Sequence, residues 1–282
     1  MNRLLLLLAA ALMTPACATT LATPSTAVTA DTRSIELPAA GGRKISLIVW
    51  EASRPRGVIL FGHGLGGQPT AYRAMIDRWV AQGYSVVAPL SVDSRAHPDR
   101  ASYDLPAGFA ARVEDLAVAR GFIARTFPGQ RVALAGHSYG SLFALIGAGA
   151  LTPAGQVQGP PVAAVLAFSS PGAIPQIVSP GTYTSLSAPL LMISGDKDIV
   201  PGFVPDPAAH RLPFDTSPAG DKLLVTVRGG GHDLASSADP ATAAALADLS
   251  LAFLDTHLAG DRIARRQLGR LTTTPLFTLE RR

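Results

Sequence analysis

The chain has 282 residues, of which 48% are hydrophobic, and a formal net charge of +4. That size and composition are enough to bury one large core. The charge is modest, and the sequence has neither a basic helix interleaved with aromatic residues nor zinc-finger spacing, so no nucleic-acid partner is expected. The single cysteine, Cys17, excludes an internal disulfide, a thiolate nucleophile and a cysteine metal site in the rest of the chain.

The first residues have the pattern of an export signal. A positively charged start is followed by nine apolar residues, 4–12, which are too few to cross a bilayer. Small residues around Cys17 offer a cleavage site, so residues 1–18 are predicted to be a signal peptide and residues 19–33 a disordered leader. The alternative is that Cys17 is the lipidated cysteine of a bacterial lipoprotein. The chain is therefore expected to be exported, periplasmic or secreted, and to touch a membrane only through lipid on Cys17.

Residues 34–260 are predicted to form one α/β domain, because short apolar runs alternate with amphipathic ones. The pattern indicates a mostly parallel, twisted sheet with helices on both faces, opened by an antiparallel pair. Residues 169–189 are too few for a helical cap, which predicts an open cleft, and residues 261–282 receive no placement. The predicted strands cover residues 34–37, 44–50, 58–61, 84–88, 131–135, 162–168, 190–194 and 222–227, and the predicted helices cover 69–82, 109–127, 141–151 and 241–258.

A glycine-rich loop, residues 63–67, follows the strand at 58–61. Together with Gly62, this loop satisfies the spacing of a dinucleotide-binding fingerprint. Such a site needs an acidic residue at the end of the next strand to hold a ribose, and Asp93 arrives too late for that position. The sequence therefore predicts no dinucleotide, and the loop remains available for another role.

The segment Gly136-His137-Ser138-Tyr139-Gly140 follows directly from a predicted strand and precedes a predicted helix. Gly-x-Ser-x-Gly in that context is typical of a sharp turn that lifts the serine hydroxyl clear of the backbone. The flanking glycines are needed because a Cβ there would collide with neighbouring elements. A plain flexible turn is the alternative, but the strand and helix on either side favour Ser138 as a nucleophile.

A serine hydroxyl is a weak nucleophile and needs a base that is oriented by an acid. In a parallel sheet such groups gather where strands end. Asp198 lies in the loop after the strand at 190–194 and precedes Ile199, which with the next residues can shield it from water. Asp196, in the same loop, is the competing acid, although it can instead cap the turn by accepting from backbone amides.

His232 is the predicted base, because it alone of six histidines follows a strand within a glycine loop and comes after the acid in sequence. It is expected to be a neutral imidazole near pH 7 that takes the proton of Ser138. His137 lies inside the serine turn and would point away from its neighbour. His97, His210 and His257 lie in a polar loop, a proline-rich loop and a helix end.

Two backbone amides are predicted to stabilise an oxyanion. One is that of Tyr139, at the start of a helix where unpaired amides and the helix dipole favour negative charge. The second is expected from the loop after the strand at 58–61, at Leu65, with Gly64 as the alternative.

Taken together, these pieces resemble the α/β-hydrolase superfamily, which keeps the same order of nucleophile, acid and histidine. The resemblance implies an α/β-hydrolase fold without a large cap, and a carboxylic ester hydrolase that needs no metal or organic cofactor. Within the superfamily the short, cap-free form resembles dienelactone-hydrolase-like, chlorophyllase-like and polyester-hydrolase-like carboxylesterases. It departs from them because it lacks the cysteine nucleophile of the first and the C-terminal disulfide usual in the last.

The sequence thus predicts an esterase that acts on a small-molecule ester through an acyl-enzyme formed on Ser138, with His232 and Asp198 as its partners. A small-substrate peptidase or other acyl hydrolase with the same residues is an alternative, although a peptidase would need an anchor for a free amino terminus. A non-catalytic binding protein of this fold is the other alternative. Retention of all three side chains argues against it. The oligomeric state is not predicted.

Overall fold

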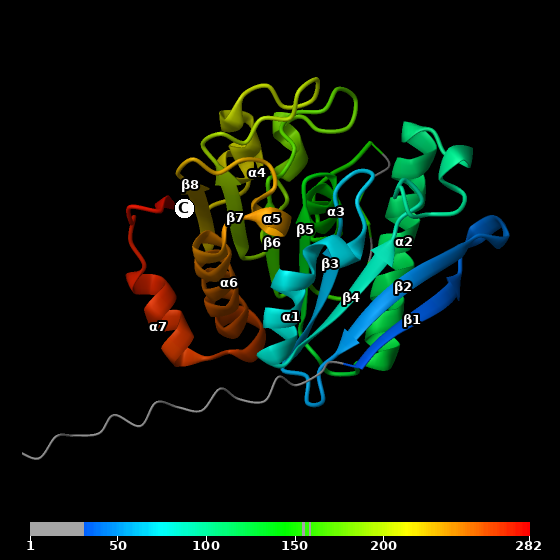
Figure 1. Ribbon diagram of the computed structural model, residues 1–282, viewed down its shortest axis with the longest axis horizontal. Helices are drawn as coiled ribbons and strands as arrows, with labels where there is room; N and C mark the ends of the chain where they lie inside the picture. The colour runs from blue at the N-terminus through cyan, green and yellow to red at the C-terminus, as the bar shows by residue number, and fades with distance from the viewer. Residues whose placement is uncertain (1–30, 154–155, 158) are drawn as a thin grey trace, which may run out of the picture.

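The computed structural model describes residues 31–153, 156–157 and 159–282. Its described part is built on a nine-stranded sheet in the order β1-β2-β4-β3-β5-β6-β7-β8-β9, with helices packed against it (Figure 1). From β4 to β8 neighbouring strands are parallel, while β1, β2 and β9 pair antiparallel. The predicted fold class, a mostly parallel α/β sheet, is confirmed.

The strands follow the apolar runs of the sequence. The strands β3 and β5 to β7 are almost wholly buried, as expected for parallel strands covered on both faces. Because they run parallel, their carboxyl ends meet at one edge of the sheet. The bounds are β1 Asp31–Pro38, β2 Lys44–Glu51, β3 Gly57–Gly62, β4 Tyr84–Leu90, β5 Val132–His137, β6 Ala164–Phe168, β7 Leu190–Gly195, β8 Lys222–Val227 and β9 Phe277–Arg281.

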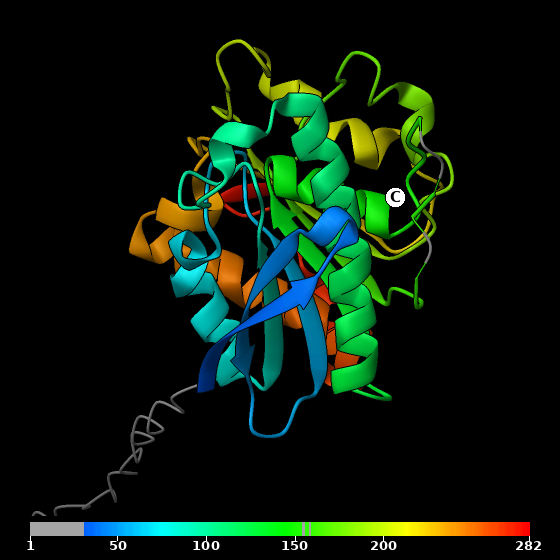
Figure 2. The same ribbon diagram turned by 90° about the vertical axis from the view of Figure 1, so that its right-hand side faces the viewer.

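The helices divide between the two faces of the sheet. Side chains of α1, α6 and α7 join one buried apolar cluster, and those of α2 and α3 join the other. Figure 2, which has β1 and β2 in front, shows these layers. None of the described helices is long and apolar enough to span a bilayer. The helices are α1 Arg73–Ala81, α2 Leu105–Thr126, α3 Tyr139–Gly147, α4 Leu212–Thr216, α5 Leu234–Ser237, α6 Pro240–Leu254 and α7 Arg262–Arg270.

The helix boundaries differ in places from those expected. Helix α2 begins four residues earlier than predicted, because the Asp104 side chain accepts a hydrogen bond of 2.8 Å from the amide of Ala107 and caps the helix. The predicted helix 69–82 is divided into a 3-10 turn, η2 (Pro69–Tyr72), and α1. Neither change moves the strand ends on which the predicted site depends.

The two ends of the domain also depart from the prediction. Strand β1 begins at Asp31, so residues 31–33 pair with β2 and do not belong to a leader; an ion pair of 2.9 Å between Arg33 and Glu51 joins the two strands. The rest of the predicted leader, the signal peptide and Cys17 lie outside the described residues. Residues 261–282, left unplaced by the sequence, form α7 and the edge strand β9.

Candidate active site

Ser138 lies between β5 and α3 with φ 52° and ψ −125°, a left-handed conformation that a non-glycine residue adopts only under strain. The glycines on either side let three elements meet backbone to backbone. A Cβ on Gly140 would overlap the carbonyl oxygen of Gly62 at the end of β3, and one on Gly136 would overlap the carbonyl of Gly140. Tight packing of β3, β5 and α3 therefore holds the serine on its turn.

The three predicted side chains come together at the carboxyl ends of β5, β7 and β8. His232 Nε2 lies 2.9 Å from Ser138 Oγ, and His232 Nδ1 lies 2.7 Å from Asp198 Oδ1. Both are hydrogen-bond distances, and the first is within the reach that proton transfer from Ser138 to His232 requires. Asp198 is completely buried, whereas the His232 side chain is 27% exposed and faces the cleft.

Asp196, the competing acid, lies elsewhere. Its Oδ1 accepts a hydrogen bond of 2.7 Å from the amide of Gly229, so it joins the loops after β7 and β8. Of the two carboxylates, only Asp198 is hydrogen-bonded to His232. The geometry therefore favours Asp198, which the sequence also indicated, over Asp196 as the acid. The catalytic role of Asp198 stays a prediction.

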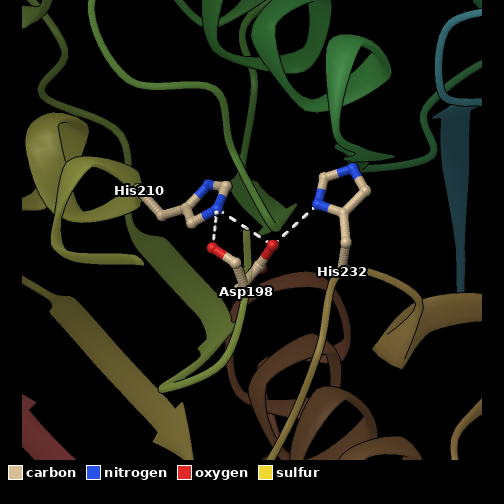
Figure 3. A group of neighbouring side chains, drawn as sticks. All are labelled: Asp198, His210 and His232. Atoms are coloured by element: carbon tan, nitrogen blue, oxygen red, sulfur yellow. Dashed lines mark hydrogen bonds and ion pairs between the residues drawn. The ribbon is translucent and has the colours of Figure 1, made fainter. Parts of the chain in front are cut away.

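Asp198 also binds a second histidine that sequence reasoning passed over. His210, in the 3-10 turn η5 (Pro207–Arg211), places Nε2 2.9 Å from the same Oδ1, on the side opposite His232 (Figure 3). Ser194 Oγ donates to Oδ2 at 3.1 Å. Burial alone would raise the pKa of Asp198, but the hydrogen bonds from His210 and His232 outweigh it and hold that pKa well below its usual range.

His137 is a second residue whose role the sequence did not reveal. The Nε2 atom of His137 lies 2.6 Å from the backbone carbonyl oxygen of His232. Because a carbonyl oxygen can only accept, His137 Nε2 carries a proton and donates to it. Its Nδ1 then accepts from the Tyr72 hydroxyl at 2.9 Å, and that hydroxyl in turn accepts from the Gly64 amide at 3.1 Å. Burial lowers the pKa of His137 to about 4, so the ring stays neutral. A chain of hydrogen bonds thus links the glycine loop to the loop of His232.

The same contacts bear on the predicted oxyanion donors. The Gly64 amide is engaged by Tyr72, which leaves the Leu65 amide as the better candidate from this loop. Leu65 and Tyr139 both line the cavity at Ser138, and Tyr139 is the first residue of α3. Orphan amides at a helix start favour an anion. The assignment of both donors stays a prediction.

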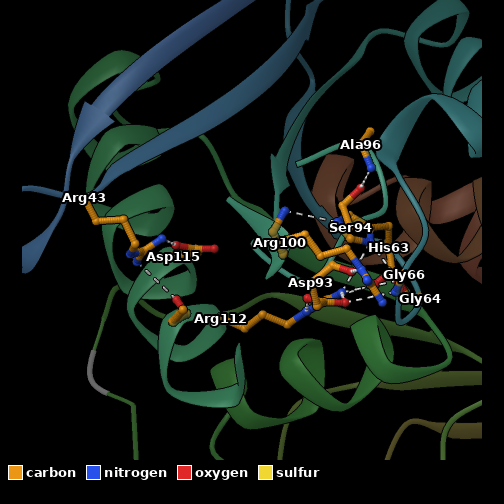
Figure 4. A network of polar contacts seen from close by, with 12 residues as sticks. Arg43, His63, Gly64, Gly66, Asp93, Ser94, Ala96, Arg100, Arg112 and Asp115 are labelled. Atoms are coloured by element: carbon orange, nitrogen blue, oxygen red, sulfur yellow. Dashed lines mark hydrogen bonds and ion pairs between the residues drawn. The ribbon is translucent and has the colours of Figure 1, made fainter. Parts of the chain in front are cut away.

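A buried ion pair holds the glycine loop in place. Arg112 donates to Asp93 through Nε at 2.6 Å and through a terminal nitrogen at 2.9 Å, and donates to the carbonyl of His63 at 2.9 Å (Figure 4). Asp93 also accepts from the Gly66 amide at 3.0 Å. Burial alone would raise the pKa of Asp93, but Arg112 outweighs it and lowers that pKa. The one carboxylate that the dinucleotide interpretation could use is therefore committed to holding the loop.

Ser138 and His232 line a cavity of about 420 Å³. Its walls are mostly apolar, and none of the described residues that line it is an aspartate, glutamate, lysine or arginine. The apolar walls are formed by Leu65, Leu105, Pro171, Ala173, Ile174, Pro175, Ile177, Val200, Phe203 and Val204.

Asp198, His210 and His232 could together offer three ligand atoms to a metal ion, all within 4.8 Å of one another. The two nitrogens lie 2.7 and 2.9 Å from Oδ1, which are hydrogen-bond distances. Neighbouring ligand atoms of a tetrahedral zinc site lie about 3.3 Å apart, given the usual metal–ligand bond lengths. The arrangement therefore fits a hydrogen-bonded group better than a metal site.

This arrangement of strands is similar to that of known protein structures. An esterase domain of a Rhodothermus marinus protein matches with a TM-score of 0.58 and 17% identity, covering 81% of this chain and 99% of that one. A Thermus thermophilus protein matches with a TM-score of 0.56 and 21% identity, covering 81% of this chain and 98% of that one. The chain has the α/β-hydrolase fold.

Within this α/β-hydrolase fold, the family model described as "Serine aminopeptidase, S33" matches residues 53–178. That match includes the glycine loop and Ser138 but ends before Asp198 and His232. Among curated proteins, none is a significant match to the sequence. The acid and base of the site therefore rest on the geometry given above.

Proposed function

We propose that the chain is a serine hydrolase that cleaves carboxylic esters with neutral acyl groups. The hydrogen-bonded series from Asp198 through His232 to Ser138, at the mouth of an apolar cavity, carries the proposal. The coarser assignment, a hydrolase of the α/β-hydrolase type, is supported by the family match and by the likeness to an esterase domain.

In the proposed mechanism Ser138 Oγ attacks the ester carbonyl while His232 Nε2 takes its proton. Asp198 holds the imidazole so that Nε2 faces the serine, and stabilises the imidazolium that forms. The amides of Tyr139 and Leu65 would receive the oxyanion; removal of one such donor typically costs ~3 kcal/mol of transition-state stabilisation. His232 then returns the proton to the departing alcohol, and water releases the acyl group by the same steps.

Aminopeptidase activity is the second candidate, because the matching family model carries that description. An aminopeptidase must hold the positively charged amino terminus of its substrate, which calls for a carboxylate in the substrate site. The residues described as lining the cavity offer none. An uncharged acyl group is therefore favoured over an aminoacyl group.

The two candidates are separated by a substrate series measured as kcat/KM. The series would contain p-nitrophenyl acetate, butyrate and octanoate together with alanine and leucine p-nitroanilides. Turnover of the esters, absent in Ser138→Ala, and no release from the aminoacyl anilides would support the proposal. Faster hydrolysis of the anilides than of every ester would contradict it.

Export remains a proposal, because residues 1–30 lie outside the described part of the chain. We propose that residues 1–18 direct secretion and are removed near Ala18. Intact-mass measurement of the full chain expressed in a bacterium would show either cleavage there or a lipid mass on Cys17. Recovery of the uncleaved, unmodified chain only in the cytoplasm would contradict export in either form.

A further inference from the structure

His210 is a buried histidine that the proposed mechanism does not use. Only 1% of it is exposed, and it lies on the far side of Asp198 from His232. The centroids of the His210 and His232 rings are 6.0 Å apart, and the ring planes are within 26° of parallel. The Asp198 carboxylate lies between the two rings (Figure 3). The acid of the site thus accepts hydrogen bonds from two histidines through one oxygen, Oδ1.

The partners of the His210 ring determine its protonation. Nδ1 lies 2.5 Å from the carbonyl oxygen of Ser170, and Nε2 lies 2.9 Å from Asp198 Oδ1 and 3.0 Å from the Asp198 carbonyl. The two carbonyl oxygens can only accept, and so can Oδ1 of the ionised Asp198 carboxylate, so both ring nitrogens must carry protons. A neutral ring would leave one nitrogen lone pair facing an oxygen lone pair at hydrogen-bond distance.

His137 shows what a neutral histidine looks like in the same site. One of its nitrogens faces an acceptor, the carbonyl of His232, and the other faces the Tyr72 hydroxyl, which can donate. In the described part of the chain, the hydrogen-bond partners of the His210 ring are all acceptors. Burial alone would lower the pKa of His210, but the hydrogen bond and charge of Asp198 outweigh it, and the pKa is raised above 6.5.

The buried neighbours of this cluster carry no charge of their own. His137, at the end of β5, is neutral because burial lowers its pKa to about 4. Tyr72, from η2, is neutral because burial raises its pKa above 10.0. Asp198 and His210 are therefore the buried groups of this cluster that carry charge.

The exposed charges nearby are otherwise engaged or open to solvent. Arg211 follows His210 in the chain, but its guanidinium pairs with Asp215 at 2.7 Å and with Glu280 at 2.9 Å. Lys197, in the loop after β7, and Asp233, in the loop after β8, are exposed, as is Asp196. Solvent and salt screen such charges strongly.

We propose that His210 is held as an imidazolium and acts as a positioning residue, fixing Asp198 and offsetting its charge so that His232 stays an unprotonated base to lower pH. This rests on the proposed function. The His210 imidazolium lies beside the Asp198 carboxylate, which would otherwise stabilise a protonated His232 in the resting enzyme. Its positive charge also repels a proton on the His232 ring. The acid limb of the pH–rate profile is therefore set by His210 as well as by the predicted base.

Replacement of His210 by glutamine tests the proposal. Glutamine keeps one hydrogen bond to Asp198 but removes the charge, so the acid limb of kcat/KM for p-nitrophenyl acetate should move up by about one pH unit. His257→Gln is the matched control, because His257 is also buried but packs against Phe253, away from the site. A purely structural role for His210 would lower the plateau and leave the limb unmoved, and that outcome would overturn the proposal.

A second measurement needs no variant and no ester. Nitrogen-15 NMR of the histidine rings in the unmodified chain should show both nitrogens of His210 protonated at pH 8, while those of His137 and His257 show a neutral tautomer. A neutral His210 ring at that pH would overturn the proposal. If the ring is protonated but esters are not cleaved, the ion pair stands and the proposed function fails, so the two failures are distinguishable.

Discussion

The two halves of the candidate site are held by different means. The nucleophile half, formed by the loop after β3 and by the turn at Ser138, depends on backbone packing: Gly62, Gly136 and Gly140 meet without room for a Cβ. The acid–base half, formed by the loops after β7 and β8, also contains a close backbone contact between Gly195 and Gly230, but its functional groups are held by side-chain hydrogen bonds. The first half is thus sensitive to added volume, and the second to lost charge or a lost partner.

The largest effect is expected where the two halves meet. Ser138→Ala removes the nucleophile while leaving the glycine contacts intact, so kcat/KM should fall by about four to six orders of magnitude with little change in melting temperature. Ser185→Ala, an exposed serine in a surface loop, is the control. Comparable ester turnover by the two variants would mean that the reaction does not use Ser138.

Within the acid–base half, the two aspartates provide a matched pair. Asp198→Asn should lower kcat by about 10³–10⁴-fold, because an amide favours the wrong tautomer of the neighbouring imidazole. Asp196→Asn should cost less than about tenfold, since its amide oxygen can still accept from Gly229. A greater loss of kcat in Asp196→Asn than in Asp198→Asn would show that Asp198 is not the acid.

Within the nucleophile half, an added methyl group should be enough to disrupt the structure. Gly140→Ala would push a Cβ into the carbonyl of Gly62, and the free energy of unfolding should fall by about 3 kcal/mol or more. Gly269→Ala, in α7 with open space around it, should instead be neutral or stabilising by up to about 1 kcal/mol. Urea denaturation measures both. Equal stability of the two variants would show that the close packing does not matter.

The smallest effect is expected from the ion pair that supports the glycine loop. Arg112→Lys keeps the charge but loses the two-pronged contact with Asp93, so the loop should loosen and kcat should fall by about tenfold. The comparison variant is Arg73→Lys, which alters an exposed pair between Arg73 and Asp77. If Arg112→Lys behaves like Arg73→Lys, the pair has no part in positioning the loop.

The same contrast explains what the sequence could reveal. Glycine spacing, strand ends and the order of serine, aspartate and histidine are local patterns, so the sheet and the residues of the predicted triad could be found from them. His210 meets Asp198 twelve residues earlier in the chain, and Tyr72 meets His137 across 65 residues. Those contacts depend on how η5 and η2 pack, which no local pattern encodes.

The edges of the sheet were hard to predict for a related reason. Strand β9 is short and half-exposed, and strand β1, with the sequence DTRSIELP, has only two large apolar residues, Ile35 and Leu37. Neither carries the apolar run that marks a central strand. Pairing with β8 and β2 stabilises them, and this is a tertiary effect.

The central claim, that Ser138 is a nucleophile activated by His232, is tested most directly by a fluorophosphonate probe followed by peptide mass spectrometry. One adduct per chain is expected, on Ser138, and it should form at a sharply reduced rate in His232→Ala although the variant remains folded. A folded wild-type chain that gains no adduct, or one that reacts equally well without the imidazole, would contradict it.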